Sequence, residues 1–213
     1  MPYKNVPSSY STSVVYHVYA RGVNKMDIFL NDSDYTYFLF LLKKYLTKNF
    51  KESIVKFGAK NEVTPSSVYG EVKLLEYCLM NNHFHLLLEN VKNDGVTKLM
   101  RRILSNYVKY FNHKYSRQGP LIQGGFRAVP VRDERQFITV GIYIHINPLK
   151  DGLVEKIQNY PYSSYKYYFE NKKAKWLEVS KLIKENTDYK NMERYFNKET
   201  AMFNNLVEYQ NRL

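Results

Sequence analysis

An α+β fold built on one antiparallel sheet is predicted by three features of this 213-residue sequence. Strand patterns and helix patterns follow one another in the order strand, helix, strand, strand, helix, strand. The two middle strands are joined by a two-residue turn, so the second strand returns beside the first. The sequence contains no internal repeat. The order is that of the ferredoxin-like, split βαβ arrangement, in which helices cover one face of an antiparallel sheet.

The first strand and the first helix are predicted from periodicity. Residues 14–22 (VVYHVYARG) alternate and are rich in β-forming residues, which predicts a strand. The segment NDSD at 31–34 supplies N-capping side chains for a helix that follows. Apolar residues then recur at helical spacing, at Phe38, Leu41, Leu42 and Tyr45. Residues 57–71 are polar and irregular, which favours a loop insertion.

A β-hairpin and the longest helix are predicted in the middle of the chain. Residues 73–80 (KLLEYCLM) and 83–90 (HFHLLLEN) are strand patterns, and Asn81 and Asn82 between them indicate a turn. Residues 93–119 then form the longest helical pattern of the sequence. Its apolar face consists of Val96, Met100, Ile103, Tyr107 and Phe111.

The last strand and the last helix of the sheet domain lie between residues 121 and 148. Residues 121–131 (LIQGGFRAVPV) predict a strand that two adjacent glycines interrupt. Residues 133–147 predict a helix that Asp133 caps and Pro148 ends. Lys, Asn and Glu dominate the sequence after residue 168. We therefore predict a main domain over residues 1–168 and a helical C-terminal extension over residues 169–213.

The charge balance indicates a polyanionic partner. There are 32 Lys and Arg against 20 Asp and Glu, which gives a net charge of +12. Nucleic acid fits such an excess first and an acidic membrane surface second. The 21 tyrosines interleave with these cations, as single-stranded nucleic acid requires, although most tyrosines pack in cores.

The remaining composition indicates a soluble protein of the cytoplasm. Cys78 is the only cysteine, which excludes an internal disulfide and a zinc site made of several cysteines. The N-terminus lacks the apolar core of a signal peptide, and no apolar run is long enough to span a bilayer.

Two histidines stand one residue apart in the segment NNHFHLLLEN. On a strand, His83 and His85 share one face while Phe84, Leu86 and Leu88 share the other. The two imidazoles are then about 7 Å apart at the backbone and could converge on one divalent ion. The alternative is a pair of half-exposed strand histidines without a ligand.

The helix over residues 133–147 carries a narrow polar lane between two apolar flanks. The lane consists of Gln136, Thr139, Tyr143 and Asn147. A helix that is apolar on both flanks is largely covered, and covered polar groups need partners. Tyr143 and Asn147 are therefore expected to face something polar. The alternatives are a tyrosine hydroxyl bonded to backbone and an asparagine that caps the helix before the proline.

Together these features resemble the single-tyrosine HUH transposases, and in particular the REP-associated tyrosine transposases. The resemblance covers about residues 10–168 in family order. The segments that carry it are YHVYARGVN (16–24), CLMNNHFHLLLE (78–89), SNYVKYFNHKY (105–115), GPLIQGGFR (119–127), YIHINPLKDGLV (143–154) and YPYSSYKYY (160–168).

The resemblance implies a metal-dependent cleavage of single-stranded DNA. His83 and His85 would bind Mg²⁺ or Mn²⁺, with Asn147 as a third ligand where insertion-sequence members commonly have glutamine. Tyr143 would attack the scissile phosphate and leave a 5′-phosphotyrosine and a free 3′-hydroxyl. A later 3′-hydroxyl would reverse the step and rejoin strands. The family also recognises a DNA hairpin beside the cleavage site.

Six cations are predicted to contact DNA. Arg21 lies on the first strand, and Arg117 and Arg127 flank the glycine-rich strand, where small residues would let a DNA backbone approach. The polar side of the long helix contributes Arg101, Arg102 and Lys109. A solvated helix face is the alternative for this last group.

Two other functions are compatible with the sequence. One is a domesticated protein that binds DNA hairpins on the same fold without catalysis. The other is a metallohydrolase of small molecules or RNA in which Tyr143 is structural. The sequence leaves open whether the protein is a monomer or a homodimer.

Overall fold

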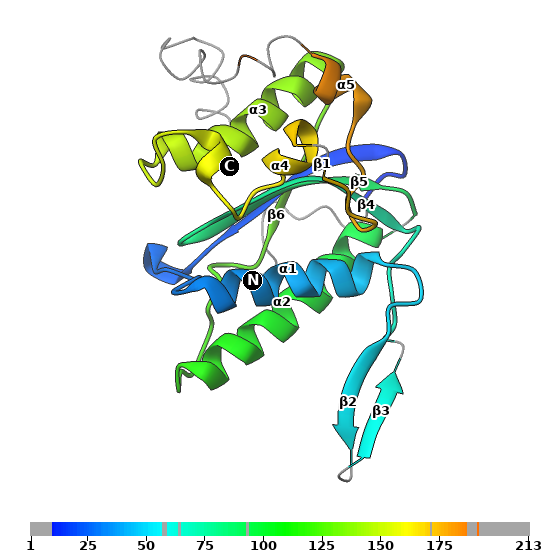
Figure 1. Ribbon diagram of the computed structural model, residues 1–213, viewed down its shortest axis with the longest axis vertical. Helices are drawn as coiled ribbons and strands as arrows, with labels where there is room; N and C mark the ends of the chain where they lie inside the picture. The colour runs from blue at the N-terminus through cyan, green and yellow to red at the C-terminus, as the bar shows by residue number, and fades with distance from the viewer. Residues whose placement is uncertain are drawn as a thin grey trace.

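The fold is a four-stranded sheet with helices packed on both sides (Figure 1). It is taken from a computed structural model that describes residues 10–56, 59–63, 65–92, 94–170, 172–186 and 191. For residues 53–56, 59–63 and 181 only the backbone is described.

The central sheet has the topology that the order of elements predicts. Its strands are β1 (Val14–Arg21), β4 (Val72–Met80), β5 (His83–Asn90) and β6 (Arg127–Pro130), in the spatial order β4-β5-β1-β6. Every neighbouring pair is antiparallel. The hairpin β4-β5 therefore lies beside β1, and the predicted α+β, ferredoxin-like sheet is confirmed.

One face of the sheet is covered by two helices. These are α1 (Asp32–Leu46) and α2 (Gly95–Lys114), which pack against each other and against the sheet (Figure 1). Their predicted apolar positions are all buried in the larger hydrophobic core, together with Phe84, Leu86 and Leu88 of β5. The predicted alternation of β5 is thus confirmed on this side.

The helix α3 (Glu134–Lys150) covers the opposite face, so the expectation that helices lie on one face only was wrong. Figure 1 shows α3 on the far side of the sheet from α1 and α2. A second apolar core joins it to Cys78 of β4 and Leu87 of β5. The physical reason is that β4 and β5 carry further apolar residues on this second face, and these must be covered. This second layer puts the polar lane of α3 over the histidine face of β5.

The helix α3 begins where it was predicted to begin but ends later. Asp133 is the N-cap, and its Oδ1 accepts a hydrogen bond of 2.7 Å from the Gln136 amide. Pro148 was predicted to end the helix, but α3 continues to Lys150. A proline inside a helix removes one amide hydrogen bond, so the packing of the apolar flanks of α3 must outweigh this loss. The chain then turns, with the amide of Leu153 donating to the Pro148 carbonyl at 2.9 Å.

One predicted loop and one predicted strand differ from the structure. A hairpin of β2 (Glu52–Lys56) and β3 (Ala59–Val63) projects from the body, so the loop expected from residue 57 begins instead with a strand at residue 59 (Figure 1). The strand predicted over 121–131 is only β6, because Gly124 and Gly125 adopt positive φ angles of 65° and 80°. Such angles interrupt a strand and are favoured in glycine.

Short elements complete the described chain. They are the 3₁₀ helices η1 (Val23–Lys25) and η2 (Ile157–Asn159) and the helices α4 (Tyr165–Phe169) and α5 (Lys181–Glu185). Residues 162–164 cover the outer edge of β4, where the Leu79 amide donates to the Tyr162 carbonyl at 3.0 Å. Of the helices predicted in the C-terminal extension, α5 is described; residues 172–180 before it are not helical, and the prediction for residues after 186 lies outside the described residues except for residue 191. None of the described helices is both long and apolar enough to cross a membrane.

Candidate active site

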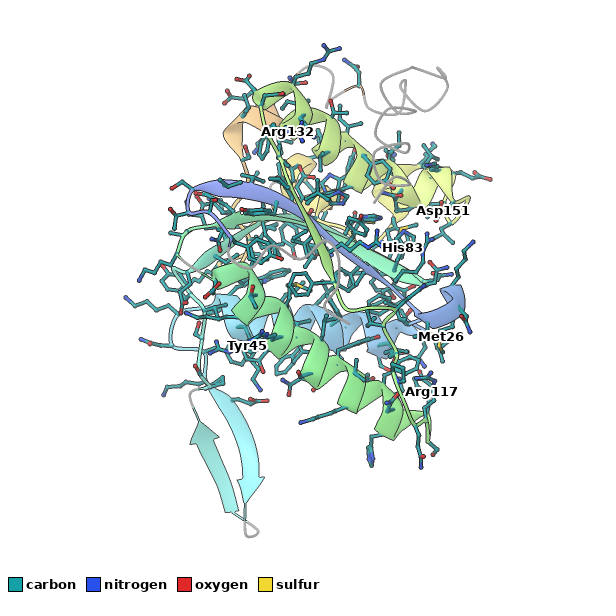
Figure 2. The ribbon with its side chains drawn as sticks, turned by 180° about the vertical axis from the view of Figure 1, so that it is seen from behind. Met26, Tyr45, His83, Arg117, Arg132 and Asp151 are labelled. Carbon is teal, nitrogen blue, oxygen red and sulfur yellow. The ribbon has the colours of Figure 1, made fainter. Side chains whose placement is uncertain are left out.

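The register of β1 against β5 gathers polar side chains on the α3 face of the sheet. Tyr19 lies opposite His85, and Arg21 lies opposite His83. Residues that face each other across an antiparallel pair share one side, and alternate residues of a strand do too. His17 therefore joins the same side, one diagonal step from His85. In Figure 2, His83 lies between the sheet and Asp151, which follows α3, whereas Tyr45 and Arg117 lie on the other side.

The two predicted ligand histidines lie together and are both buried. Their ring centroids are 4.9 Å apart. Burial lowers the pKa of His83 to about 4, and the charges of Arg21 and Lys150 act in the same direction. Burial likewise holds the pKa of His85 well below its usual value. Both imidazoles are therefore neutral at pH 7, which is the state in which histidine binds a metal.

In each histidine the Nδ1 atom has a polar partner. The Nδ1 atom of His83 lies 2.6 Å from the Oδ1 atom of Asn82. The Nδ1 atom of His85 lies 2.9 Å from the Nε2 atom of His17. The Nε2 atom of His85 is buried without a hydrogen-bond partner among the described residues. A buried unpaired nitrogen is costly, so this atom calls for a ligand.

Tyr143 reaches this cluster from α3, as the polar lane of the sequence predicts. Its ring centroid lies 5.4 Å from that of His85 and 6.1 Å from that of His17. Burial raises the pKa of Tyr143 to about 12, and Asp151 acts in the same direction. The Asn147 amide and the Arg21 charge oppose this rise. The hydroxyl is thus protonated at pH 7 and needs help to lose its proton.

Asn147 is also buried at the cluster, one turn after Tyr143. Its side-chain nitrogen donates a hydrogen bond of 2.7 Å to the backbone carbonyl of Tyr143. The amide nitrogen of Asn147 therefore bonds to the backbone of its own helix, which is close to the capping role given above as the alternative to metal binding. The amide oxygen is the atom that could contact an ion.

The donor set suits a divalent cation bound by few protein ligands. Within the described ranges, no group of three or more His, Cys, Asp and Glu side chains is placed to hold a metal. Two neutral imidazoles and one amide oxygen remain as the candidate ligands, with the unpaired Nε2 atom of His85 as the clearest sign of fit in the described chain. Imidazole and oxygen donors accept several divalent ions, so they do not select one metal.

Two cations lie near Tyr143, and a third shares its side of the sheet. Arg21 and Arg127 are both exposed and share the cluster's side of the sheet, since Tyr19 lies opposite Arg127 on β6. The Nζ atom of Lys150 lies 5.6 Å from the centroid of the Tyr143 ring. The sequence prediction did not include Lys150. Its position two turns after Tyr143 on the same helix would have indicated it.

The other cations predicted to bind DNA lie away from this cluster. Arg101, Arg102 and Lys109 are on α2, which packs on the opposite face of the sheet. Arg102 donates to the Ser66 carbonyl at 2.9 Å and to its hydroxyl at 2.8 Å. Arg117 donates to the Asn112 amide oxygen and to the Pro120 carbonyl, both at 3.1 Å. Arg21 and Arg127 thus lie on the side of the sheet that faces Tyr143, and these four do not.

Two members of the cluster were missed from the sequence. His17 and Tyr19 alternate with Arg21 along β1, so a period of two places them on one face of that strand, but only the register of β1 against β5 brings this face to His85. The Tyr19 hydroxyl is a second buried atom without a hydrogen-bond partner in the described part of the chain. His145 of α3 is a further buried histidine outside this cluster, with its Nε2 atom 2.6 Å from the Ser164 hydroxyl oxygen.

Comparisons with known proteins point to one family. A family model described as "Transposase IS200 like" matches residues 31–147. A protein of Haemophilus influenzae, provisionally assigned as a REP-associated tyrosine transposase, is 30% identical over 99 residues, which cover 41% of this chain and 56% of that protein. The match thus spans little more than half the length of that relative.

A solved structure has the same fold. It is described as a REP-associated tyrosine transposase bound to a REP hairpin. The TM-score is 0.55 at 16% identity, over 79% of this chain and 84% of the other. At that identity the likeness concerns the fold alone.

Proposed function

The chain belongs to the IS200-like transposase family, and on that premise we propose that it cuts and rejoins single-stranded DNA through Tyr143. The observation that carries the proposal is the meeting of Tyr143 with His83 and His85. These residues are 58 to 60 positions apart along the chain (143 − 85 and 143 − 83) and lie on different layers. Their rings are nevertheless neighbours, with 5.4 Å between the centroids of Tyr143 and His85.

The reaction exchanges one phosphodiester bond for another. The Tyr143 oxygen bonds to the scissile phosphorus and gives up its proton, while the bond from phosphorus to the 3′-oxygen breaks. The 3′-oxygen takes up a proton and leaves as a hydroxyl, and the 5′ end remains on the tyrosine. Attack by a second 3′-hydroxyl on this phosphotyrosine reverses the exchange and joins two strands without another energy source.

The buried surroundings of Tyr143 oppose the first step unless charge is compensated. Because burial raises the pKa of Tyr143 to about 12, a phenolate there is unfavourable in the free protein. Arg21, Arg127 and Lys150 provide positive charge on the same side of the sheet, where a phosphate would bind. We assign to these cations the neutralisation of the scissile phosphate.

His83, His85 and the oxygen of Asn147 would hold Mg²⁺ or Mn²⁺ in this proposal. When bound, such an ion polarises the phosphate and stabilises the charge that develops on it. The two imidazoles are neutral and buried, and the Nε2 atom of His85 lacks another partner in the described residues. The side chain of Asn147 is one methylene shorter than that of a glutamine, so its amide oxygen extends less far from the helix.

The proposed substrate is single-stranded DNA beside a hairpin. The net charge of +12 supports a nucleic-acid partner. A hairpin is proposed because the solved structure with this fold is described as bound to one. The exposed cations Arg101 and Lys109 of α2 are proposed to contact its phosphates at a distance from Tyr143. The proposed setting is the cytoplasm, on the DNA of the host.

Cleavage of labelled hairpin oligonucleotides tests the proposal. The wild-type protein with Mg²⁺ or Mn²⁺ should cut a single-stranded flank and form a protein–DNA adduct that survives denaturation. Tyr143→Phe should abolish both products and keep hairpin affinity within about twofold, because it removes one oxygen from a side chain that packs in the apolar core.

Tyr165→Phe is the matched control, since Tyr165 packs against His145, away from the cluster. It should cut like the wild type. Cleavage by Tyr143→Phe at the wild-type rate would contradict the role of Tyr143. Hairpin binding by the wild type without any cleavage would favour the idle DNA-binding alternative.

A further inference from the structure

The third histidine of the cluster, His17, has no part in the cleavage chemistry described above. It lies on β1, its exposed fraction is 4%, and its ring centroid is 5.0 Å from that of His85. Its Nε2 atom is 2.9 Å from the Nδ1 atom of His85. Between two ring nitrogens at this distance, one carries the proton and the other accepts it.

The direction of this bond follows from what His85 must do. A neutral imidazole has one protonated nitrogen, and only the other can bind a metal. If the proton of His85 were on Nε2, that buried nitrogen could not be a ligand. With the proton on Nδ1, His85 donates to the Nε2 atom of His17 and Nε2 of His85 keeps its lone pair.

We propose that His17 is a positioning residue that fixes the tautomer and orientation of His85, so that Nε2 of His85 faces the ion. This inference rests on the proposed function, because it assumes a metal at His83 and His85. Metal-binding histidines generally donate their second ring N–H to a fixed acceptor, and here the acceptor is another imidazole.

The neighbouring ligand histidine supports the same interpretation. His83 has its Nδ1 atom 2.6 Å from the Oδ1 atom of Asn82, and an amide oxygen can only accept. The proton of His83 is thus on Nδ1, and its Nε2 atom carries the lone pair. Both histidines then present the same nitrogen, one held by Asn82 and the other by His17.

The position of His17 favours positioning over direct ligation. The Nε2 atom of His17 contacts the Nδ1 atom of His85, while the Nε2 atom of His85 has no hydrogen-bond partner in the described residues. The diagonal place of His17 on β1 sets this contact by register, since Leu87 and not His85 lies directly opposite.

Mn²⁺ binding and histidine tautomers in the DNA-free protein test the proposal. His17→Phe keeps a ring in the core but removes the acceptor, and His17→Gln restores an acceptor oxygen. We expect His17→Phe to weaken Mn²⁺ binding by roughly 10- to 100-fold. We expect His17→Gln to recover most of that affinity. In ¹⁵N-histidine spectra without metal, His85 should carry its proton on Nδ1 in the wild type and shift towards Nε2 in His17→Phe.

The control is His145→Gln, which changes another fully buried histidine outside the cluster and should leave Mn²⁺ affinity unchanged. Wild-type Mn²⁺ affinity in His17→Phe would overturn the proposal. A weaker affinity with the tautomer of His85 unchanged would also overturn it, because His17 would then be a direct ligand. A wild-type protein that binds no Mn²⁺ would instead contradict the metal site of the proposed function.

Discussion

At the scale of single residues, the cluster depends on burying histidines in their neutral form. Four of the five histidines in the chain are buried: His17, His83, His85 and His145. Burial is the first cause of the lowered pKa in all four. Neutral imidazoles suit metal binding, but the same burial makes the fold sensitive to acid.

This burial predicts how stability changes with pH. In the unfolded chain a histidine binds its proton near pH 6.5, whereas the pKa of folded His145 is lowered to about 3. Between these values the unfolded state binds more protons, so the free energy of unfolding falls as the pH falls. Each such histidine contributes about 1.4 kcal/mol per pH unit within this window.

Replacing His145 isolates one of these contributions. His145→Gln should unfold more easily at pH 7.5, because it weakens the bond to the Ser164 hydroxyl. From pH 6.5 to 4.5 the free energy of unfolding of this variant should fall less steeply than that of the wild type, because its unfolding takes up about one proton fewer. Urea titrations at several pH values measure this slope. An unchanged slope would mean that His145 is protonated in the folded protein.

The residues of the site were predictable to different degrees. His83, His85 and Tyr143 could be found because strand and helix periods place each on a polar stripe. His17 required the register of β1 against β5, and register depends on pairing between segments nearly 70 residues apart. The internal bonds of Arg102 and Arg117 could not be found, because both depend on the path of a loop.

At the scale of elements, local patterns predicted existence better than boundaries. The helices α1, α2 and α3 and the strands β1, β4 and β5 all lie where their periodicity places them. Pro148 did not end α3, since tertiary packing of its apolar flanks outweighs the absence of one hydrogen bond. The hairpin β2-β3 was missed because its strands are short and polar.

The positions of β1 and α2 predict different roles for their cations. Arg21 lies beside His83, so Arg21→Gln should lower the cleavage rate even when DNA is saturating. The double variant Arg101→Gln, Lys109→Gln should lower hairpin affinity and leave that rate unchanged, because α2 packs on the other face. The slope of log affinity against log salt should fall by about 0.7 to 0.9 for each DNA phosphate that the variant no longer neutralises.

Lys98→Gln is the control on α2, because Lys98 already pairs with Glu71 at 2.5 Å. It should change neither the affinity nor the salt slope by much. If Arg21→Gln altered affinity alone and the α2 variant altered the rate, the assignment of the two faces would be reversed. Binding by fluorescence anisotropy and single-turnover cleavage measure both quantities.

At the scale of the whole molecule, the sheet separates two functions of one chain. Its α1 and α2 side holds the larger apolar core, and its α3 side holds the cluster of His17, His83, His85 and Tyr143. The expectation of helices on one side only was wrong because α3 is not among the two crossover helices of the fold. That third helix is the element that carries the proposed nucleophile, so the additional layer is what completes the site.

The boundary at residue 168 and the oligomeric state stay predictions. Residues just after the boundary pack on the main domain, where Trp176 stacks on Tyr77 with 5.6 Å between ring centroids. The amide of Glu178 also donates to the Leu74 carbonyl at 2.9 Å. The first part of the extension is thus continuous with the core.

Mass spectrometry of the trapped protein–DNA adduct tests the central claim most directly. The wild-type protein would be incubated with a hairpin oligonucleotide and Mn²⁺, denatured, and digested with protease and nuclease. Among the 21 tyrosines of the chain, only the peptide with Tyr143 should carry a nucleotide on its phenol oxygen. A nucleotide linked to any other tyrosine would contradict the account.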